Sequence, residues 1–150
     1  MLKKDVIIIG GGAAGLAAAA ACQEKGIQDI LIIERESHLG GILKQCIHDG
    51  FGLIKFKHSY TGPEYAQKYI DIVEKKKIPY LLNSMVINID QRKIVTVANQ
   101  DGLLKYQARA IILAMGCRER TRGAIGIPGT RPAGIYTAGV AQNLINLNIY

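Results

Sequence analysis

The chain has 150 residues, a length that suits a single domain at about 100–200 residues per domain. Its 49% hydrophobic and 21% charged residues exclude a disordered or low-complexity protein. The net charge of +7 permits anionic partners, but Lys and Arg are dispersed along the chain, so we expect no nucleic-acid interface.

The N-terminal residues predict a strand, a glycine-rich turn and a helix. Asp5–Ile9 consists mainly of β-branched residues, which is typical of a strand buried on both faces of a parallel sheet. It leads into Gly10-Gly11-Gly12-Ala13-Ala14-Gly15, a GxGxxG motif. Ala13–Lys25 is predicted to be a helix of small residues that ends at Gly26, a left-handed C-cap.

A second buried strand, Asp29–Ile33, ends at Glu34 and completes a dinucleotide-binding unit. In such a unit Gly10 permits the tight turn, Gly12 lets the backbone approach a pyrophosphate, and Gly15 lets the helix pack close to the sheet. The helix N-terminus offers free N–H groups to the phosphates. Glu34 lies 19 residues after Gly15, where a carboxylate can accept hydrogen bonds from both ribose hydroxyls. The unit predicts adenine-dinucleotide binding without deciding between FAD and NAD.

The segment after Glu34 departs from a plain NAD-binding fold. A second glycine doublet, Gly40-Gly41, is followed by residues 42–60, which have no sustained helical period. A helix then begins after Thr61, whose side chain and that of Glu64 fit a capping box. An NAD-only domain would instead continue with further βαβ units.

Beyond this helix the sequence predicts short strands in place of a helical crossover. Three are expected to be antiparallel, and a turn leads to a fourth; the four segments are 80–82, 86–89, 94–97 and 103–107. A fully apolar strand, 110–114, ends at Met115-Gly116. A C-terminal helix is expected from Thr137 to about Asn146.

The order of these features resembles the flavoproteins of the pyridine nucleotide-disulfide oxidoreductase superfamily, and the resemblance covers essentially the whole chain. It implies an α/β, Rossmann-like FAD/NAD(P)-binding fold, with a parallel sheet and a β-meander crossover at about residues 80–107. It also implies FAD as the cofactor and NAD(P)H as a co-substrate of the full-length protein. The first unit would bind the FAD adenosine and pyrophosphate through Gly10, Gly12, Ala13, Ala14, Gly15, Glu34 and Arg35.

The later motifs add contacts that the resemblance implies. Gly40-Gly41 would lie beside the pyrophosphate and ribityl chain, and the backbone of Val86 would touch the adenine. Ala114-Met115-Gly116 matches an Ala-Thr-Gly strand end in which Met replaces Thr. Gln45 is a candidate amide donor to the flavin ring.

One departure from the family bears on mechanism. Disulfide reductases of the family carry a CxxxxC pair soon after the glycine doublet, whereas residues 42–48 hold a single cysteine, Cys46. We therefore predict flavin chemistry without a redox-active disulfide. Cys46 and His48 are the candidates for a catalytic role, with a buried thiol and a hydrogen-bonded loop histidine as the alternatives. Segments 40–48 and 116–120 resemble one subgroup, the flavin subunits of amine- and opine-oxidising enzymes, some of which work beside a glycerol-3-phosphate dehydrogenase-like flavoprotein.

The remaining cysteines and histidines give no pattern of a metal site. The three cysteines have no CxxC spacing and the three histidines lie ten residues apart, so we predict no metal. Such cysteine usage is typical of a reduced protein, and we expect a cytoplasmic location. No segment reaches the roughly 18 consecutive apolar residues that span a bilayer, so we predict no membrane span.

Residues 1–150 are thus expected to form one FAD-binding domain of a flavin-dependent oxidoreductase. The enzyme would transfer hydride or electrons between FAD and a nicotinamide or a small organic substrate, with a partner flavoprotein or electron-carrier subunit. An NAD(P)H-binding domain follows such a domain in the family, so we expect the chain to stop short of it and to be inactive alone. Two alternatives remain open: an NAD-binding dehydrogenase domain and a non-catalytic nucleotide-binding scaffold.

Overall fold

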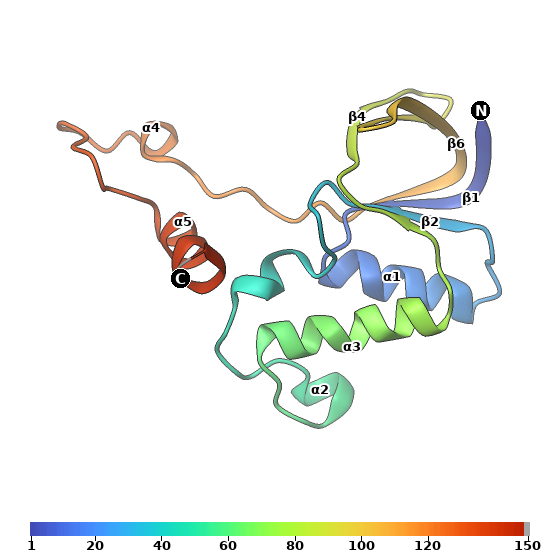
Figure 1. The fold of residues 1–150 in the computed structure, drawn as a ribbon, viewed down its shortest axis with the longest axis horizontal. Coiled ribbons are helices and arrows are strands. Elements are labelled where there is room, and N and C mark those ends of the chain that lie inside the picture. The colour runs from blue at the N-terminus through green and yellow to red at the C-terminus, as the bar shows by residue number, and fades with distance from the viewer. Residues whose placement is uncertain (149–150) are drawn as a thin grey trace.

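The computed structural model describes residues 1–148 as an α/β fold built on one six-stranded sheet. The strand order is β3-β2-β1-β6-β5-β4. Two helices, α1 (Ala13–Glu24) and α3 (Gly62–Lys75), cover one face of the parallel strands. Strands β4 to β6 curl over the opposite face (Figure 1). The predicted fold class, an α/β fold with parallel strands and a meander, is confirmed.

The parallel strands follow the order of a dinucleotide-binding unit. β1 (Leu2–Ile9) pairs in parallel with β2 (Ile30–Ile33), with Ile9 opposite Ile33. β3 (Tyr80–Leu81) pairs in parallel with β2. The expectation of an antiparallel strand at this position is therefore wrong. The reason is that α3 carries the chain back along the sheet, so that the next strand runs in the same direction as β2.

The antiparallel part of the sheet consists of β4 (Met85–Ile89), β5 (Ile94–Asn99) and β6 (Gly102–Leu113). The two strands expected at 103–107 and 110–114 are one continuous strand. β6 pairs antiparallel with β5 along one edge and in parallel with β1 along the other. It therefore joins the meander to the parallel strands through hydrogen bonds on both of its edges.

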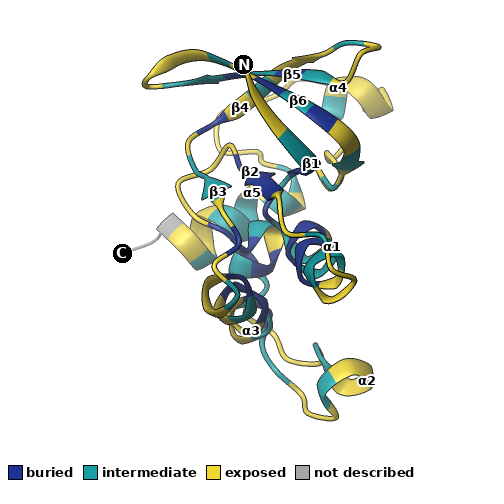
Figure 2. Ribbon diagram, turned by 90° about the vertical axis from the view of Figure 1, so that its right-hand side faces the viewer, coloured by how far each residue is buried: buried dark blue, intermediate teal, exposed yellow. Residues whose placement is uncertain are grey.

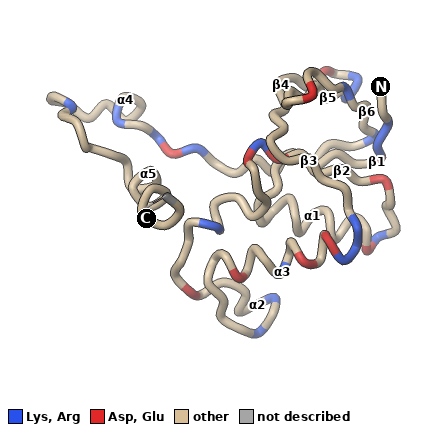
Figure 3. The backbone as a smooth tube through the Cα atoms, in the orientation of Figure 1, with Lys and Arg blue, Asp and Glu red and all other residues tan. Residues whose placement is uncertain are grey.

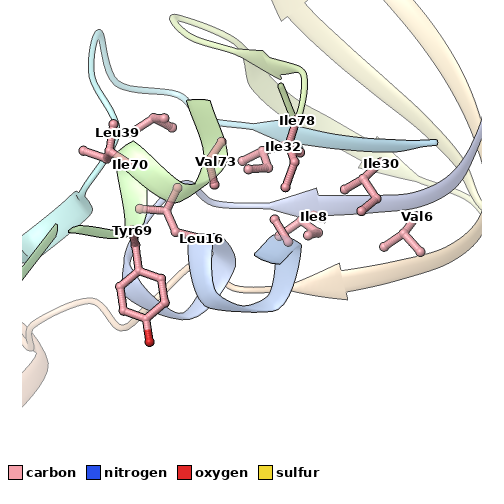
Figure 4. Packing of buried hydrophobic residues seen from close by; sticks show 11 residues of the cluster. Val6, Ile8, Leu16, Ile30, Ile32, Leu39, Tyr69, Ile70, Val73 and Ile78 are labelled. Atoms are coloured by element: carbon pink, nitrogen blue, oxygen red, sulfur yellow. The ribbon is translucent and has the colours of Figure 1, made fainter. Parts of the chain in front are cut away.

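Both faces of the β1–β2 pair are buried, and alternate residues contribute to two separate cores. Ile8 and Ile32 face the helices, where Leu16, Tyr69 and Val73 fill the space (Figure 4). The alternate side chains pack under the meander, in a cluster of Ile7, Ile9, Leu31, Ile33, Val95, Val97, Tyr106 and Ala108. Burying one large aliphatic side chain contributes about 1.5–3 kcal/mol. Burial is accordingly concentrated in the central strands and the inner sides of α1 and α3 (Figure 2).

Five short helical elements complete the described chain. The stretch expected to lack a helical period holds η1, a 3-10 helix (Gly41–Gln45), and α2 (Leu53–Phe56). Beyond β6 lie α4 (Arg122–Ile125), α5 (Ala138–Asn143) and a π-helical turn, η2 (Leu144–Asn148). The predicted C-terminal helix is thus a shorter α-helix than expected, because its last part adopts the π-helical turn.

Helix α3 begins with the predicted capping box. The hydroxyl oxygen of Thr61 accepts a hydrogen bond from the Glu64 N–H, and Oε2 of Glu64 accepts one from the Thr61 N–H at 2.8 Å. The Thr61 backbone N–H, and then its hydroxyl, hold the pKa of Glu64 below its ordinary value of 4.5. The box therefore pairs N–H groups that the helix itself leaves open.

Replacing Thr61 by alanine is expected to lower the free energy of unfolding by about 1 kcal/mol, because α3 loses its N-cap acceptor.

The stabilisation from the Glu64 carboxylate is present above pH 4.5 and is lost as the pH falls through the lower folded-state pKa. Urea unfolding of the parent and Glu64→Gln over a pH series measures this loss. Glu74→Gln, at the other end of α3, is the matched control, because Glu74 takes no part in the capping box. A Glu64→Gln difference that persists at low pH would contradict the prediction.

Lys and Arg side chains are distributed along the chain, from β1 to the α4 region (Figure 3). Within residues 1–148, no helix is long and apolar enough to cross a membrane. In the same part of the chain, no group of three or more His, Cys, Asp or Glu side chains is arranged to hold a metal ion.

Candidate functional site

The glycine-rich loop lies at the carboxyl end of β1 and leads into α1. Gly10 has a φ of +107°, a conformation that glycine adopts readily and other residues rarely do. A Cβ atom on Gly10 would overlap the carbonyl oxygen of Ala114, and a Cβ atom on Gly15 would overlap the carbonyl oxygen of Gly10. These two glycines therefore let the loop, the helix and the end of β6 pack closer than any larger residue permits.

Gly12 differs from these two glycines because the space beside it is open. A Cβ atom there would have one described neighbour within 4 Å, the Cα of Gly41 at 3.8 Å. Gly12 is also the N-cap of α1, and no side chain caps this helix. Open N–H groups in the first turn and the positive end of the helix dipole favour an anion. The loop therefore fits the pyrophosphate of a dinucleotide.

Glu34, at the end of β2, holds the loop from the side. It is 6% exposed, and its Oε2 accepts a hydrogen bond from the Gly11 N–H at 2.6 Å. Its Oε1 accepts one from the Glu36 N–H at 2.9 Å. Each carboxylate oxygen can accept a further hydrogen bond. Glu34 can therefore fix the loop and still receive ribose hydroxyls.

The Gly40-Gly41 doublet lies against the same loop. The Gly40 N–H donates to the Gly11 carbonyl at 2.8 Å, and Gly12 and Gly40 form a parallel bridge. A Cβ atom on Gly41 would come within 3.0 Å of the Gly12 Cα. The doublet and the loop thus form one backbone surface beside the open space at Gly12.

The end of β6 lies against the glycine-rich loop. Ala114 donates its N–H to the Ile9 carbonyl at 2.8 Å, which places it beside the first glycine of the loop. Met115 follows with 64% of its surface exposed, and Gly116 has a φ of +70°. Because Met carries no hydroxyl, any polar contact of this residue with a cofactor would be made by main-chain atoms.

The residues before β4 are also held at this edge. The Ser84 N–H donates to the Glu34 carbonyl at 2.9 Å, and the Asn83 N–H donates to the Glu36 carbonyl at 2.9 Å. Val86 follows two residues later and packs against the core under the meander. The start of β4 therefore lies next to the end of β2 and Glu34.

Other predicted site residues lie outside this cluster of backbone contacts. Arg35 is exposed and pairs with Glu36 at 3.2 Å. The Cys46 thiol donates to a carbonyl of η1 at 3.3 Å, and the His48 ring lies against that of Phe51 at a centroid distance of 5.1 Å. In the described part of the chain, no hydrogen bond joins the Cys46 or His48 side chain to the glycine loop. Catalytic roles for Cys46 and His48 stay predictions.

Three contributors to the site were missed by reasoning from sequence. The Gly11 N–H donates a hydrogen bond to the Glu34 carboxylate, and the run of three glycines was the sequence signal that could have pointed to Gly11. Gly62 donates its N–H to the Cys46 carbonyl at 2.8 Å, and a Cβ atom on it would overlap two carbonyl oxygens at η1. Ser84 carried no sequence signal, because its role is played by its main-chain N–H.

Comparison with known protein families identifies the family of this chain. A sequence profile described as pyridine nucleotide-disulphide oxidoreductase matches residues 4–146. The chain belongs to this family. The membership confirms the predicted superfamily, whose cofactors are FAD and NAD(P). The three cysteines of this family member are free.

Solved structures show the same fold at low sequence identity. Thioredoxin reductase from Streptococcus pyogenes is 27% identical, with a TM-score of 0.65 over 85% of this chain and 39% of that one. Bacillithiol disulfide reductase from Bacillus cereus is 26% identical, with a TM-score of 0.62 over 76% of this chain and 40% of that one. L-proline dehydrogenase from P. horikoshii is 22% identical, with a TM-score of 0.75 over 97% of this chain and 28% of that one.

These similarities support the family but do not identify a subgroup within it. The chain spans 28 to 40% of the length of the three proteins just named. A steroid monooxygenase bound to NADP is also similar in structure, so the predicted subgroup of amine- and opine-oxidising enzymes is not singled out. A search of curated protein sequences found no match.

Proposed function

We propose that this chain is the FAD-binding part of a flavin-dependent oxidoreductase that works without a redox-active disulfide. The observation that carries the proposal is a convergence at one edge of the sheet. The open space at Gly12, the uncapped N-terminus of α1 and the buried carboxylate of Glu34 lie together there. When bound, FAD supplies the ring that accepts or gives hydride.

Each part of the site has a distinct task in this proposal. Gly12 and the first N–H groups of α1 bind the pyrophosphate, and Glu34 accepts the ribose hydroxyls. Gly40-Gly41 lies beside the pyrophosphate and ribityl chain, and the main chain at Val86 lies toward the adenine. The assignment of Ala13, Ala14, Gly15, Arg35, Ala114, Met115 and Gly116 to FAD binding belongs to the same proposal.

The meander supports FAD over NAD alone. A domain that binds only NAD continues from its second strand with further helical crossovers. Here β4 and β5 return as an antiparallel pair before β6 enters the sheet beside β1. We accordingly propose one FAD-binding domain over residues 1–150, and the NAD-binding dehydrogenase becomes an outcome of the test below.

The substrate side of the reaction is proposed on the sequence motifs. Cys22, Cys46 and Cys117 are free and none forms a CxxxxC pair, so hydride or electrons pass directly between FAD and a nicotinamide or small organic substrate. Segments 40–48 and 116–120 support a place near the amine- and opine-oxidising subgroup. A partner flavoprotein or electron-carrier subunit and a cytoplasmic location complete the proposal.

Titration of the purified chain with FAD and with NAD⁺, followed by flavin fluorescence and thermal unfolding, tests the proposal. We expect FAD to raise the midpoint of thermal unfolding and ADP to compete with it, because the adenosine half makes the described contacts. Stabilisation by NAD⁺ and not by FAD would overturn the proposal in favour of the dehydrogenase. RNA binding that weakens with salt, without FAD binding, would favour the non-catalytic scaffold.

A further inference from the structure

Gln45, the last residue of η1, is held by side chains from the far end of the sequence. It is 8% exposed, and its Nε2 donates to Oε1 of Gln142 at 3.1 Å. Its Oε1 accepts a hydrogen bond from Nδ2 of Asn143 at 3.0 Å. Its main-chain carbonyl accepts one from Nδ2 of Asn146 at 2.6 Å. We call Gln45, Gln142, Asn143 and Asn146 the amide latch.

The latch joins two segments that are about a hundred residues apart. After β6 the chain runs away from the sheet through α4 and comes back as α5 and η2 near η1 (Figure 1). Residues 115–136 are almost all exposed, so little of this connection packs on the body of the protein. The latch therefore supplies hydrogen bonds that hold α5 and η2 to η1.

The other end of η1 lies at the cofactor site. Gly41 begins η1 and is in contact with Gly12, whereas Gln45 ends η1 about 8 Å away at the 3-10 rise of roughly 2 Å per residue. The Gly62 N–H holds the carbonyl just after η1, at Cys46. The short helix thus connects the latch residue Gln45 to the glycine doublet at the cofactor site.

We infer that Gln45 is a positioning residue for the cofactor loop and that the amide latch couples FAD binding to the docking of α5. This inference rests on the proposed FAD-binding function. With the latch closed, Gly40-Gly41 is held beside the open space at Gly12. With the latch open, only the fraction of molecules whose doublet lies in place binds FAD at full affinity.

The inference gives Gln45 a different role from a direct donor to the flavin ring. The nitrogen and the oxygen of its side-chain amide form hydrogen bonds with α5, at 3.1 Å and 3.0 Å, and these hydrogen bonds set the orientation of the amide group. Gln142 and Asn146 are not among the residues proposed to bind FAD. Their substitution therefore separates a latch from a direct contact.

The test compares Gln142→Ala and Asn146→Ala with Gln45→Ala in FAD titrations of the whole chain. Gln142→Ala and Asn146→Ala each remove one hydrogen bond of the latch, so we expect each to weaken FAD binding about fivefold. Gln45→Ala removes two, so we expect it to weaken FAD binding at least as much. The double variant Gln45→Ala/Gln142→Ala is expected to bind FAD no more weakly than Gln45→Ala alone, since both changes break the same contact. Gln67→Ala, which removes an amide bonded to Asp71 on the exposed side of α3, is the matched control with unchanged affinity.

A second measurement does not depend on affinity. Coupling is reciprocal, so FAD should slow hydrogen exchange at the backbone amides of α5 in the parent and do so less in Gln142→Ala. FAD binding that weakens only in Gln45→Ala, with no change in Gln142→Ala or Asn146→Ala, would overturn the latch and leave a direct contact. If the parent binds FAD and all three variants bind it with the same affinity, the coupling by the amide latch is overturned but the proposed function is not. A parent that binds no FAD would overturn the proposed function as well.

Discussion

Replacing Gly12 by alanine is expected to leave the fold intact and to weaken FAD binding about 10- to 100-fold, the effect of a 1–3 kcal/mol steric clash. The φ of −79° at Gly12 suits alanine, and the nearest described atom to the new methyl group is 3.8 Å away. The methyl group therefore enters only the space that a pyrophosphate would fill. FAD titration measures the affinity, and thermal unfolding without ligand shows whether the fold is retained.

Gly15→Ala is the matched comparison three residues along the same motif. Its methyl group would overlap the Gly10 carbonyl oxygen and also crowd the Ile8 side chain at 3.3 Å. We expect this variant to lose about 1–3 kcal/mol of stability before any ligand is added. If Gly12→Ala destabilises the unliganded protein as much as Gly15→Ala does, the space beside Gly12 is not open and the pyrophosphate assignment fails.

Replacing Glu34 by alanine is expected to lower both stability and FAD affinity. The Gly11 N–H loses a buried charged acceptor 2.6 Å away, and an unpaired buried N–H costs about 1–3 kcal/mol. The ribose hydroxyls lose their acceptor at the same time, which we expect to weaken FAD binding at least tenfold. Urea unfolding and FAD titration measure the two effects separately.

Two further variants separate the tasks of Glu34. Glu34→Gln keeps an oxygen for the Gly11 N–H and should retain more stability than Glu34→Ala. Glu36→Ala leaves its own main-chain N–H in place and removes only an exposed side chain, so we expect neither effect. Equal FAD affinity in Glu34→Ala and the parent would refute the ribose assignment, and equal stability would refute the tie to the loop.

The elements with strong local signals were predictable from the sequence. The continuous apolar runs of β1 and β2 required burial on both faces, and the capping box fixed the start of α3. The direction of β3 was not predictable from its two residues, since it depends on where α3 delivers the chain. The continuity of β6 was hidden because polar residues interrupt its apolar pattern, while partners on both edges keep it extended.

The site was predictable where it depends on backbone conformation and less so where it depends on long-range contacts. Glycine spacing pointed to Gly10 and Gly15, where a Cβ would overlap a main-chain oxygen, and to Gly12, where the lack of a side chain keeps a space open. The partners of Gln45 lie almost a hundred residues away, and no local pattern marks them. Ser84 acts through its backbone, so its side chain is not the source of the contact with Glu34.

The position of β6 between β1 and β5 has a consequence for synthesis. β1 is made well before β6, yet the two strands pair from Leu2 opposite Tyr106 to Ile9 opposite Leu113. Contacts across so many residues form slowly, since the intervening chain must be ordered first. On the ribosome, β1 lacks its neighbour on this side until β6, about a hundred residues further along, has emerged. The glycine loop attached to its end therefore acquires its final shape only after β6 has been made.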